Sequence, residues 1–161
     1  MNKKGNTVGV VLLVGLFAMT VAGPARAEVN ATGAEPLLVV RVNKTMAQAV
    51  SDLQNAIADN NFVFIRKQDI YHQLGNMKAK EGRIVLVYFC NFYMLHHALK
   101  RDLRVGVFLP CKITLIQKKG YVEMVAINPR AISTQLNEGS LHSLCSKLTH
   151  DYGAILQEAQ L

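Results

Sequence analysis

The sequence is poor in charged residues, proline and glycine, and it contains no tryptophan. Only 18% of its 161 residues are charged, four are proline and eleven are glycine. Because half of the residues are hydrophobic, the chain is too apolar to be intrinsically disordered. The low proline and glycine content excludes collagen-like and low-complexity chains. These exclusions leave a globular protein, and the chain is long enough for one domain with a sizeable core.

Motifs of the common enzyme classes are also missing. The chain has no glycine-rich phosphate loop, no Gly-x-Ser-x-Gly elbow and no His-Glu-x-x-His motif. Carboxylates such as Asp69, Asp102 and Glu123 are scattered, without the pairing that acid–base catalysis requires. Three cysteines are present, but not at the Cys-x-x-Cys spacing of thioredoxin-like or haem-attachment sites. These absences favour a protein that is not an enzyme.

Residues 1–27 have the three parts of a secretory signal peptide. Lys3 and Lys4 precede an uncharged run at 8–21, and small residues flank Arg26 before a cleavage point after Ala27. The run has 14 residues, fewer than the roughly 20 that cross a bilayer, so cleavage is favoured over a permanent anchor. We therefore expect a periplasmic or secreted protein without a permanent membrane span.

Cleavage changes the net charge. The whole chain carries 18 basic and 11 acidic residues, a net charge of +7, which falls to +4 when residues 1–27 are lost. That is an ordinary charge for solubility, and together with export it argues against a nucleic-acid partner. Two clusters of basic residues are interpreted as solvated surface, with an anionic ligand or an acidic partner as the alternative. They comprise Lys78, Lys80 and Arg83, and Lys100, Arg101 and Arg104.

Residues 28–36 are small and polar and predict a flexible lead-in, whereas 37–161 predict a single α+β domain. Hydrophobic patterns indicate six extended segments and three helices, with a loop at 72–82. The strands are expected at Leu37–Val42, 62–65 (or as far as Tyr71), 83–90, 105–109, 112–118 and Tyr121–Ile127. The helices are expected at 46–57, Phe92–Arg101 and 140–155. This order favours one mainly antiparallel sheet with its long helices packed on one face.

Capping and turn residues support these boundaries. Thr45 opens a capping box, and Asn91 is a good N-cap for the helix at Phe92–Arg101. Gly120 supplies the positive φ that a tight hairpin turn requires. Asn128 and Pro129 end the last strand.

Residues 83–130 carry a distinctive series of short motifs. A hydrophobic strand ends in Cys-Asn, a helix containing Ala-Leu follows, and an apolar segment with glycine leads to Leu-Pro-Cys and later to Asn-Pro. These motifs are Cys90-Asn91, Ala98-Leu99, Gly106, Leu109-Pro110-Cys111 and Asn128-Pro129. Over residues 37–132 the chain resembles the bacterial family called domain of unknown function 302.

The resemblance implies a fold more than a function. It implies a TATA-binding-protein-like architecture of order β-α-β4-α with a short inserted helix, often as a homodimer, and no established activity. Phe92 stands where the family usually has proline, a residue whose preset φ suits the first helical position. His96 and His97 are not part of the family's pattern and inherit no role from it.

The three cysteines of the exported chain leave three interpretations open. Cys90 ends one predicted strand and Cys111 starts another, so a disulfide between them would close the intervening segment. Alternatively both are free thiols in the core, or they form a redox pair or a metal site. Cys145 falls within the apolar stripe of the last predicted helix, which favours core packing.

A functional role for the thiols has a physical basis. Cys90 directly precedes a predicted helix, whose dipole and free N–H groups lower the pKa of a nearby thiol. Together with Cys111, the Cys90 thiol could then form a redox pair or bind a soft metal ion. His96, at the edge of the helix's apolar side, could add a ligand for zinc, copper or haem iron, whereas His97 points away.

We therefore expect an exported binding or assembly module that holds a small ligand or a metal. The candidate site residues are Cys90, Asn91, His96, Pro110 and Cys111. One alternative is a thiol-redox or metal-dependent enzyme that uses Cys90 and Cys111, and another is a structural disulfide with function elsewhere on the surface. The expected partners are a second copy of the chain, a periplasmic protein or a small molecule.

Overall fold

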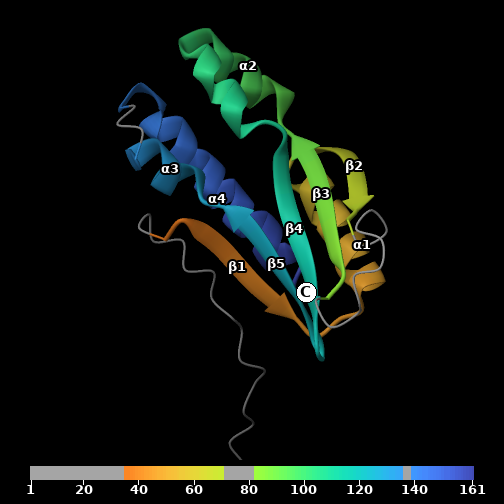
Figure 1. Ribbon diagram of the computed structural model, residues 1–161. Coiled ribbons are helices and arrows are strands. Elements are labelled where there is room, and N and C mark those ends of the chain that lie inside the picture. The colour runs from red at the N-terminus through yellow and green to blue at the C-terminus, as the bar shows by residue number, and fades with distance from the viewer. Residues whose placement is uncertain (1–34, 71–81, 136–138) are drawn as a thin grey trace, which may run out of the picture.

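The computed structural model describes residues 35–70, 82–135 and 139–161, and these form one five-stranded sheet (Figure 1). The strands lie in the order β1-β5-β4-β3-β2, and each neighbouring pair is antiparallel. Their bounds are Leu37–Val42 (β1), Val63–Asp69 (β2), Ile84–Cys90 (β3), Cys111–Lys118 (β4) and Tyr121–Ile127 (β5). The first two strands therefore occupy opposite edges of the sheet.

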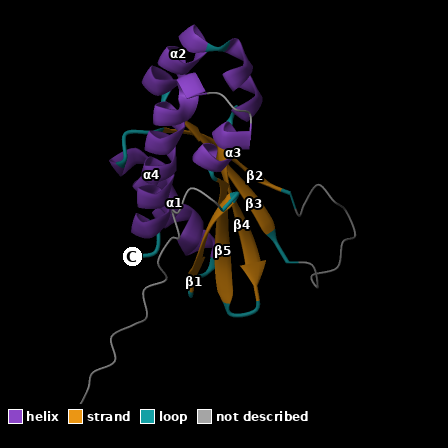
Figure 2. Ribbon diagram, turned by 90° about the vertical axis from the view of Figure 1, so that its left-hand side faces the viewer, coloured by secondary structure: helices purple, strands orange, loops and turns teal. Residues whose placement is uncertain are grey.

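The two longest helices cover one face of this sheet, and the other face carries no described helix (Figure 2). The α-helices are Met46–Asp59 (α1), Phe92–Arg101 (α2), Pro129–Gln135 (α3) and His142–Glu158 (α4). Two 3₁₀ helices, Leu103–Phe108 (η3) and Gly139–Leu141 (η4), follow α2 and precede α4. This arrangement confirms the predicted α+β class with an antiparallel sheet and helices on one face.

The core lies between the sheet and the two long helices. Alternate residues of β1, β3, β4 and β5 face the helices, as on β3, where Val85, Val87 and Phe89 are buried. The apolar stripe of α1, from Met46 to Ile57, packs against them together with the second half of α4. Removing this apolar surface from water is the main source of stability.

The predicted caps and turns are present. The Thr45 side chain accepts from the backbone N–H of Gln48, whose own side chain accepts from Thr45, so the capping box is complete. The side chain of Asn91 accepts from the backbone N–H of Met94 at 3.0 Å and caps α2. Gly120 joins β4 to β5 with a φ of +88°.

One predicted element is wrong, and one helix was not predicted. Residues 105–109 were expected to be extended, but Leu103–Phe108 forms a 3₁₀ helix because the Asp102 side chain accepts from the backbone N–H of Arg104. Asn128 and Pro129 do end β5, but they also begin α3, which the sequence patterns did not predict. The Asn128 side chain caps that helix, and proline suits its first position because no N–H is needed there.

Other sequence predictions fall outside the described residues. The predicted signal peptide, most of the lead-in and the loop at 72–82, apart from Gly82, belong to this group. Strand β2 ends at Asp69, short of the longest extent predicted for it. In the part of the chain that the structure describes, no helix combines the length and apolar character needed to cross a membrane.

Candidate functional site

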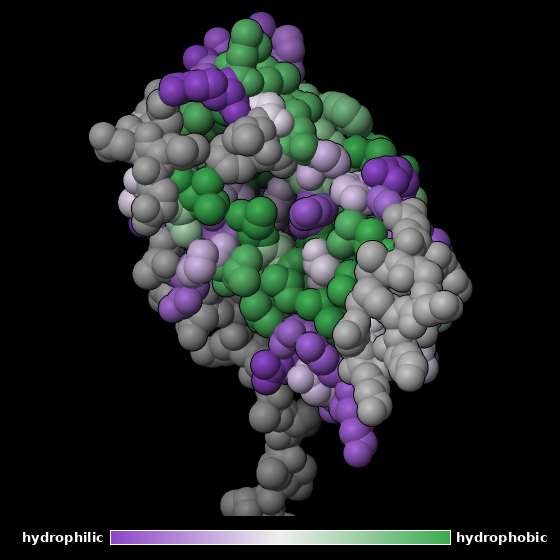
Figure 3. All heavy atoms as spheres, viewed as in Figure 1, coloured by the Kyte–Doolittle hydropathy of each residue, from purple (hydrophilic) through white to green (hydrophobic). Residues whose placement is uncertain are grey.

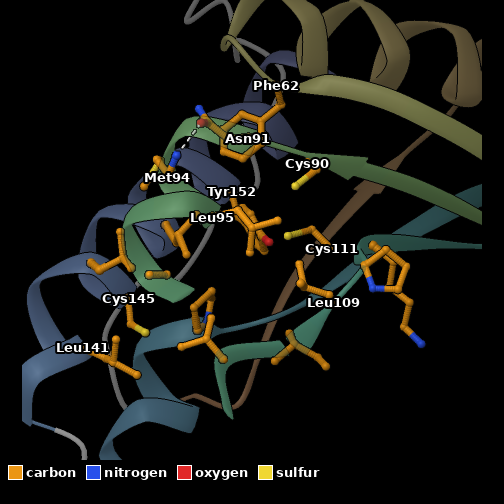
Figure 4. A pocket seen from close by; sticks show the side chains of 18 of the residues that line it. Phe62, Cys90, Asn91, Met94, Leu95, Leu109, Cys111, Leu141, Cys145 and Tyr152 are labelled. Atoms are coloured by element: carbon orange, nitrogen blue, oxygen red, sulfur yellow. Dashed lines mark hydrogen bonds between the residues drawn. The ribbon is translucent and has the colours of Figure 1, made fainter. Parts of the chain in front are cut away.

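A pocket of about 380 Å³ lies at the end of the sheet where β3 stops and β4 starts. Its walls come from α2, the segment before β4, and the first half of α4 (Figure 4). Most lining side chains are apolar, among them Met94, Leu95, Ala98, Leu109, Leu141, Leu144 and Leu148. All three cysteines of the described chain also line it. The volume falls within the range of small-molecule sites, roughly 300–1,000 Å³.

Strand register places Cys90 and Cys111 together. Cys111 lies opposite Phe89 on the β3–β4 ladder, so it is one residue away from the position opposite Cys90. Cys90 is buried and Cys111 is half-buried at the start of its strand. Figure 4 shows both sulfur atoms directed into the pocket.

Tyr152 of α4 forms the floor beside these thiols. Its ring makes edge contacts with Phe89 and Phe62, at centroid distances of 5.3 and 6.2 Å, so its position is fixed by a buried aromatic cluster. Its hydroxyl donates a hydrogen bond to the Cys111 sulfur. The pocket therefore has a rigid end where one hydroxyl and two thiols meet.

Burial keeps these groups protonated. Desolvation raises the pKa of the Cys90 thiol to about 11, and the nearby Cys111 adds to the shift. Burial also raises the pKa of Cys111, against the opposing effect of the Tyr152 hydrogen bond, and it raises that of Tyr152 itself. The pKa of Cys145 is raised by burial as well. The pocket is therefore neutral at physiological pH around its sulfur atoms.

The state of the thiols differs from two of the expectations raised by the sequence. The helix start was expected to lower the pKa of Cys90, but only 3% of this residue is exposed and desolvation dominates. Asn91 also takes up the Met94 N–H, one of the donors on which that expectation relied. The Cys90–Cys111 disulfide, one of the three interpretations that the sequence leaves open, is not formed in the structure, where all three cysteines are free thiols.

The structure does not bring His96 to the thiols. Met94 and Ala98 are the buried residues of α2, whereas Phe92 on another side of the helix is exposed. His96 is exposed beside His97, with ring centroids 5.9 Å apart, and does not line the pocket. Among the described residues, no three His, Cys, Asp or Glu side chains are grouped closely enough to hold a metal ion. The structure therefore does not bring together the candidate metal ligands Cys90, His96 and Cys111.

The other predicted site residues do meet in the pocket. Cys90, Asn91, Pro110 and Cys111 all line it. At its exposed rim are Tyr88, Lys112 and Ile127, which the strand alternation places on the sheet face without helices. Among the lining residues only Lys112 carries a charge at neutral pH.

The contribution of α4 to the pocket was not predicted from the sequence. Cys145 is buried, as its place in the apolar stripe predicts, but the first half of α4 also borders the pocket through Leu144, Cys145 and Leu148. Tyr152, further along the helix, belongs both to the core and to the pocket lining. An apolar stripe does not distinguish a helix face that packs on a sheet from one that lines a cavity.

Residues 38–159 match the protein family described as Domain of unknown function DUF302. The chain belongs to this family. Its fold is similar to a crystal structure of an uncharacterized conserved DUF302 protein from Bacillus stearothermophilus. The TM-score is 0.72 and the identity 20%, over 78% of this chain and 99% of that one. No curated protein matches the chain. These findings confirm the resemblance that the Cys90-Asn91 and Leu109-Pro110-Cys111 motifs indicated.

Proposed function

We propose that this DUF302 protein is an exported binding module that holds a small, mainly apolar molecule in the pocket beside Cys90 and Cys111. The observation that carries the proposal is the pocket itself: about 380 Å³, lined by apolar side chains and ending at a fixed group of neutral polar atoms. Burying an apolar ligand there is favourable, and the thiols and the Tyr152 hydroxyl supply a few orienting contacts.

The lining also indicates which ligands fit. No carboxylate lines the pocket, and its one charged residue, Lys112, lies at the exposed rim. An apolar body in the pocket with a neutral or anionic end at the rim would meet no unpaired buried charge. Entry from the sheet face without helices requires no opening of the core.

A soft metal ion is the second candidate, favoured by the two sulfur atoms that converge in Figure 4. A thiol-redox enzyme has less support. With a pKa of about 11, only about one Cys90 thiol in ten thousand is ionised at pH 7, whereas nucleophilic cysteines need a lowered pKa.

A matched pair of substitutions tests the pocket. The fluorescent probe 1-anilinonaphthalene-8-sulfonate, an apolar ring system with an anionic end, is titrated into the wild type, a Leu144→Phe variant and a Leu161→Phe variant. Leu144 lines the pocket, whereas Leu161 is 80% exposed at the C-terminus. We expect one saturable site in the wild type and in Leu161→Phe, and at least tenfold weaker binding in Leu144→Phe. Equal binding by all three proteins would show that the probe binds outside the pocket, which would contradict the proposal.

The metal candidate is tested in the same chain. Copper(I), supplied with a competing chelator, is titrated into the wild type and a Cys90→Ala/Cys111→Ala variant. Stoichiometric uptake that the double variant loses would favour the metal over the apolar ligand. Retained probe binding in that variant, with no copper uptake by either protein, is the result expected for an apolar site.

Export and self-association form part of the same proposal. Cell fractionation and N-terminal sequencing test export, and a first residue of Glu28 is expected. For a homodimer, the supporting feature is the sheet face without helices, where Leu37, Val39 and Ile127 are exposed and hydrophobic side chains gather (Figure 3). Light scattering should give twice the mass of one chain for the wild type and a smaller mass for Val39→Lys.

A further inference from the structure

The rim of the pocket carries a lysine in an unusual place. Lys112 lines the pocket and is exposed near the start of β4, which is the central strand of the sheet. Lysine on an edge strand commonly protects a sheet from pairing with another chain, but a central strand needs no such protection. Lysine is also depleted in strands relative to β-branched and aromatic residues. These considerations direct attention to the one feature that Lys112 borders, which is the pocket.

Strand register places a second basic residue in the same row across the sheet. Tyr88 lies opposite Lys112 on the β3–β4 ladder, and Arg66 lies opposite Tyr88 on the β2–β3 ladder. The guanidinium carbon of Arg66 is 4.3 Å from the centre of the Tyr88 ring. Arg66 Nη1 and the Tyr88 hydroxyl both donate to Gln68 Oε1, at 3.1 and 3.2 Å. Arg66 and Tyr88 are therefore held in place beside the pocket rim.

Acidic side chains do not offset the charge of this row. None of the residues that line the pocket is Asp or Glu. Glu123 lies on the same face of the sheet, but it pairs with Arg41 at 2.9 Å. Within the described part of the chain, no carboxylate lies within ion-pair distance of Lys112 or Arg66. The apolar pocket therefore opens beside two positive charges that lack an acidic partner there.

We propose that the ligand of this pocket is an amphiphile with an anionic headgroup, such as a medium-chain carboxylate, and that Lys112 and Arg66 select that headgroup. This inference rests on the proposed function and names the class of ligand. The apolar tail would lie among the side chains of α2 and α4. The carboxylate would stay at the exposed rim, where it keeps part of its hydration and gains a charge-assisted hydrogen bond from Lys112.

Two features of the site favour this orientation of the ligand. The inner end of the pocket holds neutral thiols and the Tyr152 hydroxyl, so a carboxylate placed there would lose its hydration without gaining a cation. Arg66 is two strand spacings from Lys112, roughly 10 Å, so both long side chains can reach one headgroup above Tyr88. A cationic headgroup at the same rim would be repelled.

Three amphiphiles with similar chains and different headgroups test the proposal. Decanoate, 1-decanol and decyltrimethylammonium each displace the neutral fluorescent probe N-phenyl-1-naphthylamine from the full chain. Lys112→Gln should weaken decanoate binding about fivefold, as expected for one exposed ion pair, leave decanol binding unchanged and tighten decyltrimethylammonium binding. Arg66→Gln should act in the same directions, with a smaller effect because Arg66 does not line the pocket.

Lys118→Gln is the matched control, because Lys118 is exposed on the same strand and the same face but at the far end of β4. It should change the binding of none of the three amphiphiles. Equal loss of decanoate in Lys112→Gln and Lys118→Gln, or equal loss of decanoate and decanol in Lys112→Gln, would overturn the headgroup assignment. If the wild type bound neither the probe nor any amphiphile, the proposed function itself would fail. If all three bound with affinities that do not depend on Lys112, only the headgroup assignment would fail.

Discussion

Replacement of Asn128 by Ala should destabilise the fold strongly, because this residue is fully buried and its side chain joins three segments. Its Nδ2 donates to the carbonyl oxygen of Glu35 at 2.7 Å, before β1. Its Oδ1 accepts from the backbone N–H of Arg130 at 3.1 Å and from Thr149 Oγ1 of α4 at 2.8 Å. The substitution removes all of these hydrogen bonds at once.

The expected loss follows from these contacts. Loss of an N-cap costs about 1 kcal/mol. Leaving a buried or half-buried carbonyl without its donor costs about 1–3 kcal/mol more. Thr149 retains the carbonyl oxygen of Cys145 as an acceptor at 2.9 Å, so its hydroxyl adds little. The sum is about 3 kcal/mol, which corresponds to a fall in Tm of roughly 10 °C for a domain of this size.

Urea unfolding followed by circular dichroism measures this loss. Asn55→Ala is the matched control, because Asn55 is exposed on α1 and should change the free energy of unfolding by less than about 0.5 kcal/mol. A double-mutant cycle between Asn128→Ala and Thr149→Val should give a coupling energy of about 1 kcal/mol. A loss below about 1 kcal/mol for Asn128→Ala, or a coupling energy of zero, would refute the assignment of Asn128 as the junction.

Two further predictions concern the thiols and the turns. Alkylation of Cys90 by iodoacetamide, followed by mass spectrometry, should increase with pH to a midpoint near 11 rather than 9, since burial raises its pKa. The stability contributed by the protonated thiol should accordingly be complete below pH 9 and be lost as pH rises through about 11; a midpoint near 9 would contradict both. Gly82→Ala should cost clearly more stability than Gly120→Ala in thermal unfolding. Both glycines have positive φ, but a Cβ at Gly82 would meet the backbone oxygen of Gln117, whereas at Gly120 it meets nothing. Equal costs would show that the clash is relieved by a small backbone shift.

The sequence was most informative where a pattern had one structural meaning. The apolar run that ends at Cys90, the cap at Asn91 and the turn at Gly120 each specify local geometry, and the structure has all three. The segment 105–109 failed because valines favour a strand, while the Asp102 cap favours a 3₁₀ turn. Local propensity does not decide between these when the segment lacks a partner strand.

The candidate site was only partly predictable for a similar reason. Cys90 and Cys111 are close because strand register brings them together, and register follows from two recognisable strands. The position of His96 depended on which side of α2 faces inward, and that side is set by packing against other elements, η3 and η4 among them, which the sequence did not predict. The direction of the Cys90 pKa shift likewise depends on burial by residues distant in the chain.

The pairing of β1 with β5 has a consequence for the order in which the protein can form. Leu37 at the start of β1 pairs with Ile127 at the far end of β5, and β1 has no other partner strand in the described sheet. Contacts between such distant segments form late, because the closure entropy of the long intervening chain must be overcome first. Until β5 has left the ribosome, the segment that follows the proposed signal peptide has no strand to join. Under the proposed export, this delay would keep the N-terminal segment accessible while the rest of the chain is synthesised.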